Sequence, residues 1–100
     1  MRFKIKKFTE ITKTNIFGKV LVKKTYFKIY RPVLFGLVRF YLYIKFYGSD
    51  WHKAKEIYVG YSPQRFAYKF SSEDDAREFI DEINTYPDKF IRQNIFIEEL

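Results

Sequence analysis

The chain has 100 residues, no cysteine and one histidine; 22% of its residues are aromatic, and its formal net charge is +7. This length predicts a single domain, residues 1–100. The absence of cysteine excludes disulfide scaffolds, thiolate zinc sites and thiol nucleophiles. The balance of 47% hydrophobic and 31% charged residues excludes a disordered chain, and the most apolar window, residues 33–46, is too short to span a bilayer. We therefore expect a cytoplasmic protein without a membrane span.

Charge is distributed unevenly along the chain. Residues 1–69 hold sixteen basic and three acidic side chains, a net of +13, whereas residues 70–100 hold three basic and nine acidic ones, a net of −6. AT-rich coding would enrich Lys, Ile, Phe and Tyr in any protein, but it does not determine where along the chain they fall. The order of the residues therefore predicts one domain with a basic end and an acidic end.

In the basic part of the chain, apolar and polar residues alternate with a period of two, which is typical of β-strands. Pro32 is expected to stop the second strand, and Gly36 to mark a bulge or bend in the third. Turns are expected over residues 12–18, 48–50 and 62–64. Short turns between consecutive strands favour antiparallel pairing. The predicted strands are residues 2–8, 19–30, 34–47, 56–61 and 65–70.

The periodicity becomes helical at Ser72. Ser72 is a suitable N-cap, and three acidic residues follow it where the helix dipole favours negative charge. One apolar stripe then recurs at helical spacing, made by Ala76, Phe79, Ile80 and Ile83. The helix is expected to end before Pro87. The last residues, Phe90–Leu100, are predicted as a closing strand, with a short helix from Pro87 as the alternative.

Together these patterns predict an α+β fold: a four- to five-stranded, mainly antiparallel sheet with one amphipathic helix, about residues 72–85, packed on its apolar face. Such a helix covers one face of the sheet and leaves the other to solvent. The expected core consists of Val38, Phe40, Leu42, Ile44, Phe46, Ile57, Phe66, Phe70, Phe79, Ile80 and Ile83.

The two longest predicted strands each have one apolar face and one face on which cations alternate with tyrosines. Tyrosine rings stack on exposed bases while lysine and arginine neutralise phosphates, so this mixed face is a candidate surface for single-stranded nucleic acid. Tyrosine and arginine also characterise protein interfaces, and a solvated sheet face has the same composition without any ligand. The mixed face consists of Lys24, Tyr26, Lys28, Tyr30, Arg39, Tyr41, Tyr43, Lys45 and Tyr47.

No catalytic or metal site is expected. His52 lies near Asp50 and Glu56, but no second histidine or cysteine supports a metal site there. The paired carboxylates all fall in the acidic helix and tail, where they are typical of solvated charge. The four glycines are scattered, so no phosphate-binding loop is predicted. We therefore expect no enzyme, no cofactor, no metal and no small-molecule substrate.

Two stretches of sequence carry resemblances. The segment from Arg65 to Ile80, RFAYKFSSEDDAREFI, resembles the last strand and capping helix of pleckstrin-homology-like domains, with Phe79 in place of their usual tryptophan. The chain as a whole, from its opening KIKK through the Phe17–Gly18 turn to SSEDDA, is similar to small uncharacterised accessory proteins of AT-rich Bacteroidota and their tailed phages. The second resemblance implies an accessory role, as a virion component, a host-factor inhibitor or a nucleic-acid-associated protein.

We therefore expect a non-enzymatic binding or assembly protein that uses the mixed face to contact a protein partner or another copy of itself. A phage accessory or virion component, in the host cytoplasm or the virion, fits this expectation. The acidic face of the predicted helix is either solvated or docks against the basic sheet of a neighbouring copy. The alternative function is single-stranded nucleic-acid binding through the same mixed face.

Overall fold

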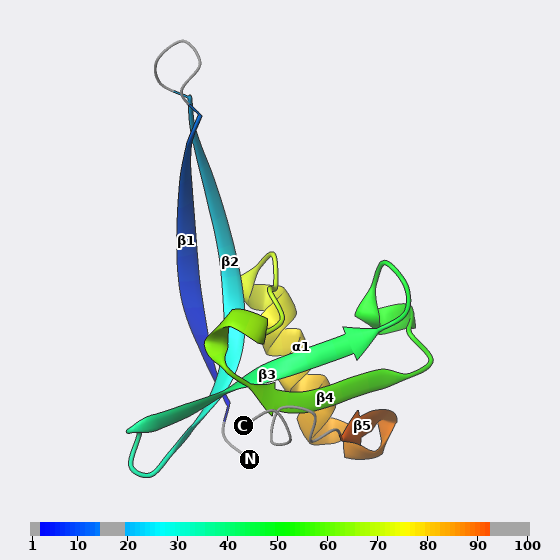
Figure 1. Ribbon diagram of the computed structural model, residues 1–100. Helices are drawn as coiled ribbons and strands as arrows, with labels where there is room; N and C mark the ends of the chain where they lie inside the picture. The colour runs from blue at the N-terminus through cyan, green and yellow to red at the C-terminus, as the bar shows by residue number, and fades with distance from the viewer. Residues whose placement is uncertain (1–2, 15–19, 93–100) are drawn as a thin grey trace.

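The computed structural model describes residues 3–14 and 20–92 and shows an α+β fold (Figure 1). Within these residues, five strands form one sheet in chain order, and all neighbours are antiparallel except the parallel β4 and β5. The one α-helix lies between β4 and β5 in sequence, because parallel neighbours need a crossover connection. The predicted class, with a mainly antiparallel sheet and one helix, is confirmed. The elements are β1 (Lys4–Thr14), β2 (Val20–Val33), β3 (Val38–Phe46), η1 (Trp51–Lys53), β4 (Ile57–Ser62), η2 (Gln64–Phe66), α1 (Glu73–Thr85), η3 (Pro87–Lys89) and β5 (Phe90–Arg92).

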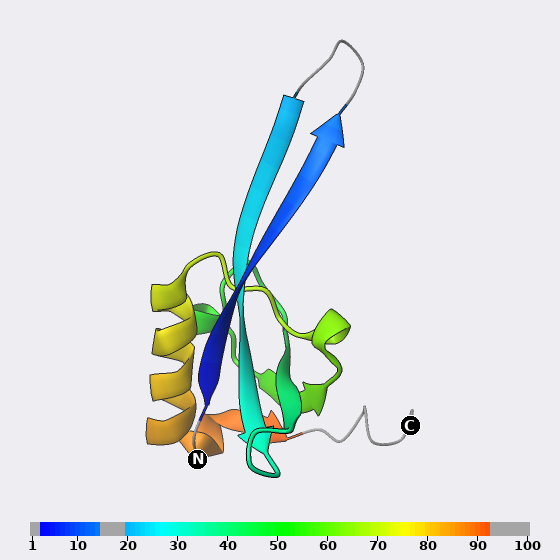
Figure 2. The same ribbon diagram turned by 90° about the vertical axis from the view of Figure 1, so that its left-hand side faces the viewer.

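Strands β1 and β2 form a long hairpin, here called the arm, that projects from the rest of the molecule (Figures 1 and 2). They pair from Lys4↔Tyr30 to Thr14↔Val20, whereas β2 and β3 pair only from Tyr30↔Tyr41 to Val33↔Val38. Between Val20 and Tyr30, β2 pairs with β1 but not with β3, so the β1–β2 and β2–β3 hairpins diverge there. The molecule is consequently elongated, with principal extents of 52 × 34 × 26 Å.

The segment between η2 and α1, residues 67–72, is here called the connector, and it fills the gap where β2 and β3 diverge. The backbone N–H of Tyr68 donates to the carbonyl of Leu42 at 3.1 Å, and Phe70 exchanges two 2.8 Å backbone hydrogen bonds with Phe27. The predicted strand over residues 65–70 is therefore wrong. Its first residues belong to η2, and the divergence of the two hairpins leaves room for only an isolated bridge at Phe70.

The core lies between the sheet and α1, which covers one face while η2 lies on the other (Figure 2). Phe79 of α1 is fully buried, and its ring contacts those of Trp51, Phe70 and Phe90 at centroid distances of 4.9, 5.6 and 5.3 Å. Edge-on and tilted ring contacts of this kind add to the stability gained from burial. The predicted core residues that are buried are Leu42, Ile44, Ile57, Phe70, Phe79 and Ile83, while Val38, Phe46 and Ile80 are half-buried.

Two predicted core residues are exposed. Phe40 lies near the β2–β3 turn, beyond the part of the sheet that α1 covers, and Phe66 lies on η2, outside the sheet. Alternation along the chain assigns a residue to a face of the sheet but does not show where the covering helix ends. Ile29 and Val59 are fully buried but were not in the expected core, because alternation does not show which part of a sheet face is covered.

Local signals placed α1 correctly. Ser72 is the N-cap, and its hydroxyl oxygen accepts a 3.1 Å hydrogen bond from the backbone N–H of Asp75. The helix ends at Thr85, before Pro87, as predicted. Phe90–Arg92 forms β5, and the rest of the predicted closing strand lies outside the described residues.

Three predictions around β1, β2 and β3 are wrong in their bounds. Pro32 does not stop β2, which continues through it to Val33; a residue without an N–H is tolerated this close to a strand end. Residues 34–37 form a separate turn, so the third strand begins at Val38. The predicted turn over residues 12–18 begins too early, because Thr12–Thr14 belong to β1, and the rest of it lies outside the described residues.

Candidate nucleic-acid interface

The register of the arm brings side chains from β1 and β2 together on one face. Phe8 lies opposite Tyr26, and Lys6 lies opposite Lys28. Side chains of directly opposed residues in an antiparallel pair point to the same face. Ile29 and Phe27, which alternate with these residues along β2, point to the opposite face and pack into the core. The predicted division of β2 into an apolar and a mixed face is therefore correct.

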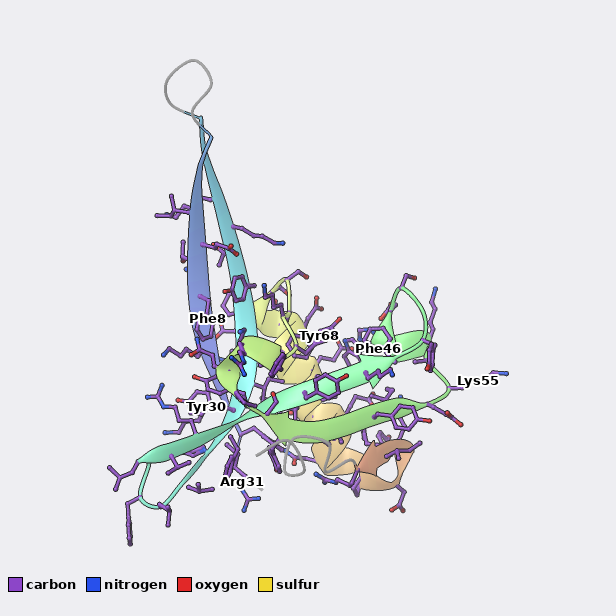
Figure 3. All side chains as sticks on the ribbon, viewed as in Figure 1. Phe8, Tyr30, Arg31, Phe46, Lys55 and Tyr68 are labelled. Carbon is purple, nitrogen blue, oxygen red and sulfur yellow. The ribbon has the colours of Figure 1, made fainter. Side chains whose placement is uncertain are left out.

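On the mixed face, two rings and three ammonium groups form a cluster, here called the cation–aromatic patch. The rings of Phe8 and Tyr26 are nearly parallel, 8° apart, with centroids separated by 5.5 Å. The Nζ atom of Lys6 lies 5.3 Å from the Phe8 centroid, and that of Lys69 lies 4.8 Å from the Tyr26 centroid. The Nζ atom of Lys28 lies 5.0 Å from Phe8 and 5.6 Å from Tyr26. Figure 3 shows Phe8 on the part of the arm nearest the sheet.

Lys28 is the buried member of the patch, only 4% exposed. Its ammonium donates a 2.6 Å hydrogen bond to the carbonyl oxygen of Gln64 in η2. Burial lowers the pKa of Lys28, and the positive charge of Lys69 lowers it further. An anion at the patch would relieve this repulsion between like charges.

Lys69 reaches the patch because of the connector. Its neighbour Phe70 is fixed against Phe27 of β2 by two backbone hydrogen bonds, so Lys69 is held beside the arm. The patch therefore combines three segments that are distant in sequence: β1, β2 and the connector. All ion pairs between side chains that the structure describes join residues of η1, α1 or η3, or Asp50 just before η1. None of these pairs involves a lysine of the patch.

The structure does not join the nine predicted residues into one open platform. Lys28 and Tyr41 are both buried, because η2 lies over this face of the sheet and in contact with β3. Tyr30 lies at the junction of the two hairpins, 5.5 Å from the Tyr41 ring and 5.0 Å from the guanidinium of Arg39. The binding roles of the remaining predicted residues stay predictions: Lys24 is exposed on the arm, whereas Tyr43, Lys45 and Tyr47 lie along β3 and just beyond it.

Sequence reasoning missed three members of the patch: Lys6, Phe8 and Lys69. A signal for the first two was present. Lys4, Lys6 and Phe8 occupy every second position of β1 and therefore share one face, as the cations and tyrosines of β2 do. The pairing register that places them against Tyr26 is not encoded in that alternation. No local signal could have found Lys69, because its position depends on the connector.

Asp50 and His52 lie together in the structure, and Glu56 is not part of their group. The Nδ1 and Nε2 atoms of His52 lie 2.6 Å from Asp50 Oδ1 and 3.0 Å from Glu78 Oε1, while Glu56 accepts a 2.7 Å hydrogen bond from the hydroxyl of Tyr58. Among the described residues, no group of three or more histidine and carboxylate side chains is arranged to hold a metal ion. His52 instead connects the turn before η1 to α1.

This arrangement predicts a pH dependence. The hydrogen bond with Asp50 raises the pKa of His52, and the contact with Glu78 raises it further. Because the folded pKa lies above the unfolded one, the stabilisation is complete at low pH and is lost as the pH rises through the folded pKa. We expect His52→Gln to lower the melting temperature more at about pH 5.5 than at about pH 8. An equal loss at both pH values, measured by thermal unfolding, would show that the charged pairing does not contribute.

Comparison of the chain with models of protein families, with curated proteins and with solved structures returns no match. Within the part of the chain that the structure describes, no helix has the length and apolar character needed to cross a membrane.

Proposed function

We propose that this is a non-enzymatic nucleic-acid-binding protein that binds single-stranded DNA or RNA against the cation–aromatic patch. The observation that carries the proposal is the convergence of three ammonium groups on the parallel rings of Phe8 and Tyr26. Proteins that bind single strands combine cations along the phosphate backbone with aromatic rings on which bases stack. The patch offers both groups together, with each ammonium nitrogen 4.8 to 5.6 Å from a ring centroid.

The charge of the arm supports the same proposal. Strands β1 and β2 together contain eight lysine and arginine residues and one acidic residue, Glu10. No aspartate or glutamate occurs anywhere between Glu10 and Asp50 in the sequence. Such a field attracts polyanions and accelerates their association. A hairpin that projects from the body also presents this charge without obstruction from the rest of the domain.

The kind of cation favours nucleic acid over a protein partner. All three cations of the patch are lysines, as are seven of the eight basic residues on the two strands. Lysine is depleted in protein interfaces, where arginine and the aromatic residues are enriched. Phosphate groups, by contrast, are contacted by lysine as well as by arginine.

Titration of a fluorescently labelled single-stranded oligonucleotide tests the proposal. We expect saturable binding at about 50 mM salt, with an affinity that falls as salt rises and a log–log slope of about −1.4 or steeper, since the exposed Lys6 and Lys69 can each neutralise one phosphate. A duplex of the same sequence should compete less well, because its bases are not available for stacking on the rings. If no saturable binding to single strands is seen at this salt concentration, the proposal is wrong.

A further inference from the structure

The turn between β2 and β3 is made of large apolar residues that contact no core. Leu34, Phe35, Gly36 and Leu37 form it, at the end of the hairpin and away from α1 (Figure 1). Phe35 is fully exposed, Leu37 is 85% exposed and Leu34 is 66% exposed. Exposed apolar residues are common singly, but a contiguous group at the apex of a hairpin marks an interaction site.

Folding does not account for these residues, because the backbone of the turn disfavours them. Leu34 and Phe35 both have positive φ angles, 52° and 59°, in the left-handed region. These are the two central residues of the turn closed by the hydrogen bond from Gly36 to Val33, where Asn-Gly suits the backbone best and large side chains carry a steric cost. Two backbone hydrogen bonds hold the turn: Gly36 and Leu37 donate to the carbonyls of Val33 and Leu34 at 3.1 Å.

Two arginines lie on the strands that flank the apolar turn, one on β2 and one on β3. Arg31 and Arg39 lie opposite the neighbouring residues Phe40 and Pro32, so they point to opposite faces of the hairpin. At about 3.3 Å per strand residue, they lie roughly 7–10 Å behind the apex. Apolar faces of interfacial proteins enter the headgroup region of a bilayer by about 5–10 Å, which would place both guanidinium groups among the phosphates.

We infer that this turn, residues 34–37 with Arg31 and Arg39 behind it, inserts into the surface of an anionic lipid bilayer. Leu34, Phe35 and Leu37 are all largely exposed at the end of a hairpin, so a fluid bilayer can surround them. The three exposed side chains of the turn offer less area than the roughly 800 Å² per partner of a standard protein interface. Arg31 and Arg39 supply the attraction to lipid phosphates, and no acidic residue occurs in the sequence between Glu10 and Asp50.

Vesicle sedimentation tests this inference. The protein should sediment with phosphatidylcholine vesicles containing about 30% phosphatidylglycerol and much less with phosphatidylcholine alone. Leu34→Asn/Phe35→Gly should weaken sedimentation at least about tenfold, since it withdraws two large apolar side chains from lipid. The same variant should melt no lower than the natural protein, because Asn-Gly suits the backbone of the turn, and it should bind oligonucleotide as before. Arg31→Gln/Arg39→Gln should reduce the preference for anionic vesicles.

Several outcomes would overturn the inference. Sedimentation that survives in Leu34→Asn/Phe35→Gly would place the lipid contact on the lysines of the arm. A natural protein that is oligomeric without vesicles, and that the same variant makes monomeric, would make a second copy the occupant of the tip. As a second measurement, the absence of cysteine allows a single environment-sensitive dye at Phe35→Cys. Its emission should shift to the blue with anionic vesicles, whereas a dye at Lys55→Cys should not respond.

Discussion

The double variant Lys6→Gln/Lys69→Gln should bind a single-stranded oligonucleotide roughly 10- to 50-fold more weakly than the natural protein at about 50 mM salt. Both side chains are exposed, and their ammonium groups lie over Phe8 and Tyr26. Each neutralised phosphate contributes about 0.7 to the log–log slope for a single strand, so the slope should become shallower by about 1.4. Fluorescence anisotropy at several salt concentrations measures both quantities.

A matched variant separates the patch from net charge. Lys53→Gln/Lys55→Gln also removes two exposed lysines and lowers the formal charge from +7 to +5, but at the far end of the β3–β4 hairpin, where Figure 3 shows Lys55. This variant should bind nearly as well as the natural protein. If the two double variants lose the same affinity, binding depends on overall charge and the assignment to the patch is wrong.

Replacing Phe79 by alanine should lower the free energy of unfolding by about 3–5 kcal/mol. The side chain is fully buried, and alanine would remove its contacts with Trp51, Phe70 and Phe90 at once. Domains of this size are stable by about 5–15 kcal/mol, so the variant should unfold at much lower denaturant concentration and be partly unfolded without it. The single tryptophan, Trp51, reports the transition directly by fluorescence, since it packs against Phe79.

Phe66→Ala provides the control for that measurement. Phe66 belonged to the expected core but is 44% exposed on η2, so its removal should cost no more than about 1 kcal/mol. A loss of similar size for Phe66→Ala and Phe79→Ala would contradict the position of the core described above.

Features that depend on neighbouring residues were predictable. The N-cap Ser72, the acidic first turn and the apolar stripe through Phe79 and Ile83 lie within one helix, so α1 followed from the sequence. The two faces of β2 could also be predicted, because the side-chain period of a strand is two and Ile29 and Lys28 fall on opposite sides.

Features that depend on long-range geometry were not predictable. The connector appeared to be a strand because its residues alternate, and only the divergence of β2 from β3 leaves it as a single bridge at Phe70. Burial of Lys28 and Tyr41 depends on the return of η2 over the sheet, which no local pattern signals. The same long-range packing brings Lys69 to the rings of the patch. Of the five residues of the patch, only Tyr26 and Lys28 were therefore predicted from the sequence.

Binding at the cation–aromatic patch is tested most sharply by photo-crosslinking of the natural protein to a single-stranded oligonucleotide that carries 5-iodouracil, with the linked peptide identified by mass spectrometry. A base that stacks on the patch lies beside Phe8 and Tyr26, so we expect crosslinks at one or both of these rings. Crosslinks confined to Tyr43, Tyr47 or the β2–β3 turn, with none on the arm, would contradict binding at the patch.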